Sequence, residues 1–82
     1  MIEEIRENID ATATGRRIRE LRDLNGLRIT DISDALGFYE PQAVYKWMRG
    51  ECLPTLRNMY RLSILFNTTI DDIVRGAEDG EE

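Results

Sequence analysis

Hydrophobic residues return every three or four positions along most of this chain, the spacing that places them on one face of a helix. Glycines and capping residues separate five such stretches. They are expected to form helices at about residues 15–25, 29–36 and 41–48, then from Pro54-Thr55 to Asn67, and last from Thr69 onward. No segment shows the alternation typical of a strand, so the sequence predicts an all-α fold.

The first and third predicted helices have the clearest limits. Thr14 is expected to cap the start of the first, and Gly26 to end it in the left-handed conformation that glycine adopts easily. The apolar stripe of this helix consists of Ile18, Leu21 and Leu24. Pro41 suits the first turn of the third helix, because its missing amide hydrogen is not needed there. The inward side of that helix is predicted to carry Val44 and Trp47.

The last two predicted helices are marked by their apolar stripes and caps. The fourth is expected to end at Asn67 and to bury Leu56, Met59, Leu62, Leu65 and Phe66. Thr69 and Asp72 have the spacing of a capping box, and the helix they open points its apolar side inward, with Ile70, Ile73 and Val74. Ahead of the first helix, the pattern is compatible with a short amphipathic helix, an arm or a frayed leader that carries Ile2, Ile5 and Ile9.

Length and charge refine this picture. A chain of 82 residues has room for one domain, and its small core favours dimerisation. The net charge of −5 arises at the two ends, since residues 1–13 carry −3 and residues 76–82 carry −4. Residues 14–75 hold ten basic and eight acidic residues, a balance that permits DNA binding. We therefore predict an N-terminal arm or short helix (1–13), a folded domain (14–75) and an acidic, disordered tail (76–82).

Residues that carry chemistry are few. Cys52 is the only cysteine and the chain has no histidine, so the sequence lacks the usual nucleophile–base pair and Cys/His metal ligands. We expect Cys52 to be inert in a half-buried loop, and we predict no enzyme activity, no cofactor and no metal. The apolar runs are too short to span a bilayer and no signal-peptide pattern occurs, so a cytoplasmic location without membrane contact is expected.

Four short motifs occur in an order that has a known counterpart. They are TGRRIRELR (14–22), DISDALG (31–37), AVYKWMRG (43–50) and LPTL (53–56). This succession resembles the Xre, or Cro and phage-repressor, family of helix-turn-helix proteins. The resemblance implies a compact, five-helix, lambda-repressor-like fold in which the predicted helices 29–36 and 41–48 form the helix-turn-helix. The second of the two helices would enter the major groove of DNA.

The resemblance also implies a function and a set of contact residues. The chain is expected to bind double-stranded DNA as a homodimer and to regulate transcription, most often as a repressor. Candidates for reading bases are Gln42, Tyr45 and Lys46, and candidates for contacting phosphates are Arg16, Arg17, Arg49 and Arg57. Trp47 is expected to belong to the core. Ser33 stands where the family usually has alanine for close helix packing.

Three features depart from the family pattern. The segment from Gly37 to Gly50 is one residue longer than usual, and Ile29 and Met48 stand where the family has glutamine and glutamate. The longer turn opens an alternative in which Tyr39 or Glu40 reaches the bases. These departures and the acidic net charge also support a second hypothesis, a protein-interaction module such as an antitoxin or regulator subunit that kept the fold and binds DNA weakly or not at all.

Overall fold

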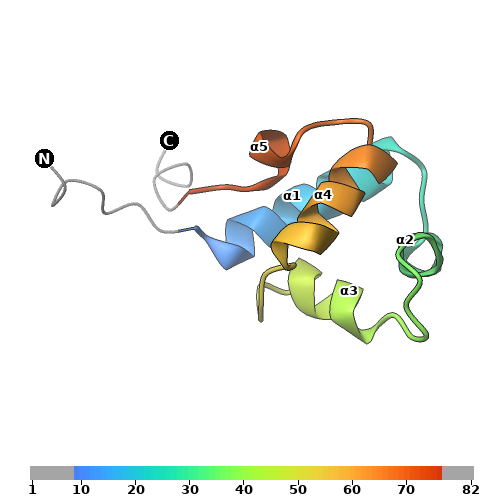
Figure 1. Cartoon of the computed structure of the whole chain (residues 1–82). Coiled ribbons are helices and arrows are strands. Elements are labelled where there is room, and N and C mark those ends of the chain that lie inside the picture. Colours follow the sequence, from blue (N-terminus) through green and yellow to red (C-terminus); the bar gives the residue numbers. More distant parts are fainter. Residues whose placement is uncertain (1–8, 77–82) are drawn as a thin grey trace, which may run out of the picture.

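A computed structural model describes residues 9–76 of the chain. Five helices form within this range and no strand does (Figure 1). The helices are α1 (Ala11–Leu24), α2 (Ile29–Ala35), α3 (Gln42–Met48), α4 (Leu56–Leu65) and α5 (Ile70–Ile73). None of these helices is long and apolar enough to cross a membrane. The predicted all-α class and the order of five short helices are confirmed.

The core lies between the five helices, with α1 packed against α3 and α5, α2 against α3, and α4 against α5 (Figure 1). Its buried members come from all five helices and their ends: Ile18, Leu21, Ile32, Leu36, Val44, Trp47, Met48, Met59, Leu62, Phe66 and Ile73. Trp47 is only 4% exposed, so the prediction that it packs in the core is confirmed. Burying an aromatic side chain of this size supplies a large share of the stability of so small a core.

The start of α1 differs from the prediction. Asp10, not Thr14, is the N-cap, and its carboxylate accepts a hydrogen bond of 3.0 Å from the backbone amide of Ala13. Thr14 is buried one turn inside the helix, where its hydroxyl accepts from the backbone amide of Arg75 at 3.0 Å. Both residues are good N-cap types. The contact with Arg75 gives Thr14 a different role.

Two of the predicted apolar stripes are shorter than expected. Leu24 is 75% exposed and Leu56 is 77% exposed, although each continues the stripe of its helix. Leu24 is the last residue of α1 and Leu56 the first of α4, so both lie at a helix end. The prediction that they are buried is wrong at these two positions.

Helix α1 and the end of α3 approach each other backbone to backbone at Gly15. A Cβ atom at this position would overlap the carbonyl oxygen of Trp47 and lie 3.0 Å from that of Met48. Gly15 therefore lets α1 contact the C-terminal turn of α3 directly. Ordinary glycine in a helix costs about 0.5–1 kcal/mol relative to alanine, and here the close contact between the two helices explains its presence.

The first and last described segments lie side by side. Ile9 and Gly76 form an isolated antiparallel bridge, and the amide of Asp10 donates to the carbonyl of Arg75 at 2.8 Å. Helix α5 begins at its N-cap Thr69, whose hydroxyl accepts from the amide of Asp72. The predictions for Ile2 and Ile5 and for most of the acidic tail concern residues 1–8 and 77–82, which lie outside the described residues.

Candidate nucleic-acid interface

Helices α2 and α3 are joined by a turn that is anchored at its first half. Gly37 has a φ of 76°, the left-handed conformation that ends α2. The amide of Phe38 donates to the carbonyl of Ser33 at 2.9 Å, and the Phe38 ring packs edge-on against Trp47 with 5.8 Å between centroids. Ser33 is buried, which agrees with the small residue expected at this crossing. These contacts in the turn thus help to fix the orientation of α3 relative to α2.

Helix α3 has one buried and one exposed face. Val44, Trp47 and Met48 are buried against α1 and the rest of the core. The solvent face carries Gln42, Tyr45, Lys46 and the C-cap Arg49, which are spaced by three or four residues. The structure therefore brings together the three predicted base-reading residues on one exposed helical face. An amide, a phenol and an ammonium group on such a face can bond with base edges in a major groove.

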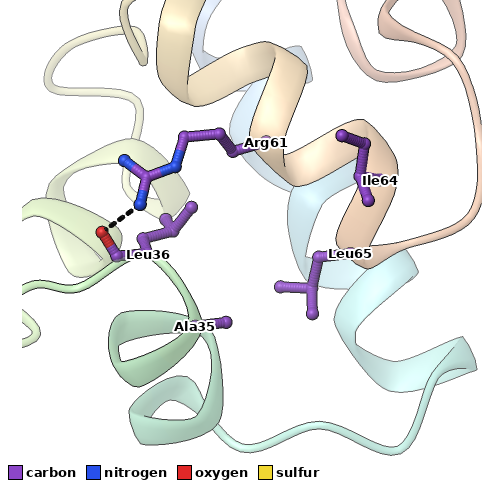
Figure 2. Close-up of a pocket in the computed structure, with 5 residues that line it drawn as sticks. All are labelled: Ala35, Leu36, Arg61, Ile64 and Leu65. Carbon is purple, nitrogen blue, oxygen red and sulfur yellow. Dashed lines mark hydrogen bonds between the residues drawn. The ribbon is translucent and has the colours of Figure 1, made fainter.

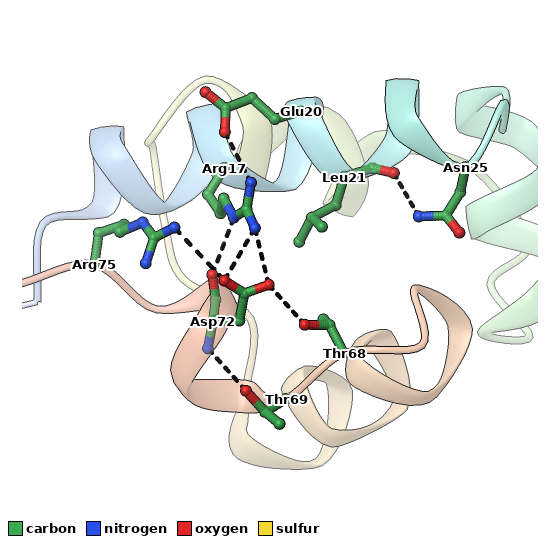
Figure 3. A network of polar contacts seen from close by, with 8 residues as sticks. All are labelled: Arg17, Glu20, Leu21, Asn25, Thr68, Thr69, Asp72 and Arg75. Carbon is green, nitrogen blue, oxygen red and sulfur yellow. Dashed lines mark hydrogen bonds and ion pairs between the residues drawn. The ribbon is translucent and has the colours of Figure 1, made fainter.

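Arg17 lies in a polar network between α1 and α5 (Figure 3). Its guanidinium donates to both carboxylate oxygens of Asp72, at 2.8 and 2.9 Å, and to the backbone carbonyl of the same residue at 3.1 Å. Glu20 accepts a further bond, and Thr68 donates to Asp72 at 2.6 Å. The bonds from Thr68 and Arg17 lower the pKa of Asp72 below its usual range. Arg17 therefore joins the first helix to the last, and its predicted phosphate contact stays a prediction.

The other predicted phosphate-binding arginines are exposed. Arg16 directly follows Gly15, which contacts the end of α3, and Arg57 lies in the first turn of α4. Arg49 also points to solvent, with a hydrogen bond of 2.6 Å to Glu51 in the loop after α3. Arg22 pairs with Asp23 at 2.7 Å.

A hollow of about 270 Å³ lies between α2 and α4, and Arg61 is one of the residues that line it (Figure 2). The hollow is lined by Ala35, Leu36, Arg61, Ile64 and Leu65. The Arg61 guanidinium donates to the carbonyl of Leu36, the C-cap of α2, at 2.6 Å. This bond satisfies one of the carbonyls that a helix end leaves open and orients α2 on α4. Nothing in the sequence pattern distinguished Arg61 from the other surface arginines.

Cys52 is exposed, which corrects the expectation of a half-buried loop. Within residues 9–76, no group of three carboxylate, cysteine or histidine side chains is placed to hold a metal ion.

Comparison with known proteins points the same way as this geometry. A family model described as helix-turn-helix matches residues 18–73. Among solved structures, the chain is similar to the restriction-modification controller protein C.AhdI from Aeromonas hydrophila, with a TM-score of 0.71 and 25% sequence identity. The similarity covers 78% of this chain and 96% of that one. None of the curated proteins matches the chain.

Proposed function

Because the chain belongs to the Xre-like helix-turn-helix family, we propose that it binds double-stranded DNA in a sequence-specific manner and regulates transcription, with repression as the expected outcome. The observation that carries this proposal is the exposed face of α3, which presents Gln42, Tyr45 and Lys46. The opposite face of the same helix is anchored in the core by Trp47. Glutamine pairs with adenine and lysine donates to guanine in the major groove. The similarity to a controller protein supports the regulatory role.

The phosphate contacts are proposed for exposed arginines around this face. Arg16 is close to the contact between α1 and α3, and Arg49 and Arg57 flank the loop that follows α3. Arg49 would exchange its bond to Glu51 for a phosphate oxygen. Such contacts position the protein on the duplex and carry no sequence information. Since Arg17 already bonds with Asp72, Arg16 is the better residue for a test.

The protein is expected to bind a random-sequence duplex with an affinity that falls steeply as salt rises. Arg16→Ala should weaken binding to every duplex alike and should lower the slope of log affinity against log salt by about one, because one fewer counterion is released. Fluorescence anisotropy over a salt series measures both quantities. If the wild-type protein bound no duplex even at low salt, the DNA-binding proposal would be wrong and the interaction module would replace it.

We propose further that the protein acts as a homodimer, which would place two α3 helices on half-sites roughly 34 Å apart. An apolar groove of about 190 Å³ between α4, α5 and the start of the described chain supports this. The groove is lined by Ile9, Leu53, Pro54, Leu56, Met59, Ile70 and Val74. Leu56 is mostly exposed at its edge, so a second copy that covered it would remove apolar surface from water.

Sedimentation should therefore show a dimer whose fraction rises with protein concentration. Leu56→Glu places a charge on the groove and is expected to shift the protein to monomer without unfolding it, because this side chain is exposed. Ile64→Glu is the matched control, since Ile64 is 62% exposed on α4 but lines the hollow toward α2. A wild-type protein that stayed monomeric at every concentration would contradict the homodimer.

A further inference from the structure

Tyr39 is the most exposed aromatic side chain among the described residues. Its exposed fraction is 101%, whereas Tyr60 and Tyr45 reach 59% and 43%. A phenol ring in this position has no intramolecular packing to lose or gain. The ring is therefore available to an external partner. Replacing it with a smaller side chain creates no cavity inside the fold.

The backbone around Tyr39 presents the ring outward. Phe38, the residue before it, is fixed by its amide bond to Ser33 and by its ring contact with Trp47. Pro41, two residues later, is the N-cap of α3 and has a restricted φ. Tyr39 thus lies in a short turn between Phe38, which is fixed by these contacts, and the N-cap of α3. Little backbone freedom would be lost if the ring made a contact there.

The turn lies directly before the face of α3 that is proposed to meet DNA. Tyr39 precedes Gln42 by three residues, and it is exposed like Gln42, Tyr45, Lys46 and Arg49 of α3. In a helix-turn-helix complex, the N-terminal residues of the second helix contact base edges in the major groove. The turn that leads into this helix therefore comes close to the sugar–phosphate strand that borders the groove.

We propose that Tyr39 contacts this strand, with its ring against a deoxyribose and its hydroxyl donating to a phosphate oxygen. The inference rests on the proposed DNA binding and adds to it a residue that positions the protein without reading sequence. Tyrosine is a regular donor to DNA phosphates. Glu40 is also exposed in the turn, but phosphates repel its carboxylate, so the favourable contact belongs to Tyr39.

A neutral contact has a signature that separates it from an arginine contact. It displaces no counterion, so its loss should lower affinity by the same factor at every salt concentration. Tyr39→Ala is expected to weaken binding roughly tenfold, the usual worth of a hydrogen bond to a charged group together with some packing. The slope against log salt should stay that of the wild type. Tyr39→Phe keeps the ring, and its affinity should lie between those of the wild type and Tyr39→Ala.

The experiment measures anisotropy with a random-sequence duplex and with a duplex selected from a library, each over a salt series. Tyr60→Ala is the matched control, because it removes an exposed tyrosine from α4 and should leave affinity unchanged. The proposal is supported if Tyr39→Ala lowers the affinity for both duplexes by the same factor and leaves the slope of log affinity against log salt unchanged.

An unchanged affinity in Tyr39→Ala would overturn the contact, and so would a changed salt slope. A loss confined to the selected duplex would show that Tyr39 reads bases, which also overturns the backbone assignment. If the wild-type protein bound neither duplex, the proposed DNA binding would fail first, and this inference with it. The wild-type measurement therefore separates the failure of the function from the failure of the residue.

Discussion

Trp47→Ala is expected to destabilise the protein by about 3–5 kcal/mol, the usual cost of truncating a buried aromatic side chain. Trp47 is 4% exposed, and its ring packs against Phe38 of the turn. Its loss would loosen the turn and α3 together. Since small domains have about 5–15 kcal/mol in all, much of the population would unfold near physiological temperature. Urea unfolding followed by circular dichroism measures the change.

Tyr45→Ala provides the control for this measurement. It truncates an aromatic residue of the same helix, two positions earlier, on the exposed face. Its cost in stability should be far smaller, because little buried surface is lost. An unfolding curve of Trp47→Ala equal to that of the wild type would show that α3 does not depend on this anchor.

The double variant Gln42→Ala with Lys46→Ala should lose most of its preference for a selected site. Each well-placed base contact is worth about 1–3 kcal/mol of discrimination, so the affinity ratio between selected and random duplex should fall by one to several powers of ten. Both side chains are exposed, and removing them leaves the core intact. Binding to random duplex should persist, weakened mainly by the loss of the Lys46 charge. Competition titrations with the two duplexes give the ratio.

Arg16→Ala is the matched control for that lost charge, since it should lower affinity for both duplexes and keep their ratio. A double variant with the full wild-type ratio would contradict the assignment of Gln42 and Lys46 as base-reading residues. In that case the hypothesis for the longer turn, with Tyr39 or Glu40 at the bases, would become the one to test.

Helical periodicity in the sequence was sufficient to predict the centre of each helix. Ile18, Val44 and Leu62 sit in the middle of their stripes, and all three are completely buried. Periodicity fails at helix ends, because it says which side of a helix is apolar and not how far the neighbouring helix reaches. Leu24 and Leu56 continue their stripes at the end of a helix, and both are exposed.

Polar contacts between residues far apart in the chain could not be predicted from the sequence. Arg17 and Asp72 are 55 positions apart, and Arg17 carries the same local pattern as the exposed Arg16. Only the packing of α5 against α1 distinguishes the two arginines. The α1 cap posed a similar problem: Asp10 and Thr14 are both suitable caps, and the bond from Arg75 to Thr14 decides between them. For the candidate site, the spacing of Gln42, Tyr45 and Lys46 was enough to predict a shared face.

The contacts between the start of α1 and the segment around α5 also determine when the protein can fold during translation. Helix α1 leaves the ribosome before the other four helices, but Asp10, Thr14 and Arg17 find their partners at Asp72 and Arg75, in and just after α5. A nascent chain that has emerged only through α4 lacks these bonds and the apolar side of α5, although α1 to α4 are already available. Contacts between such distant positions form only after the intervening chain has been ordered. The domain is therefore expected to complete its fold only after α5 and Arg75 have emerged.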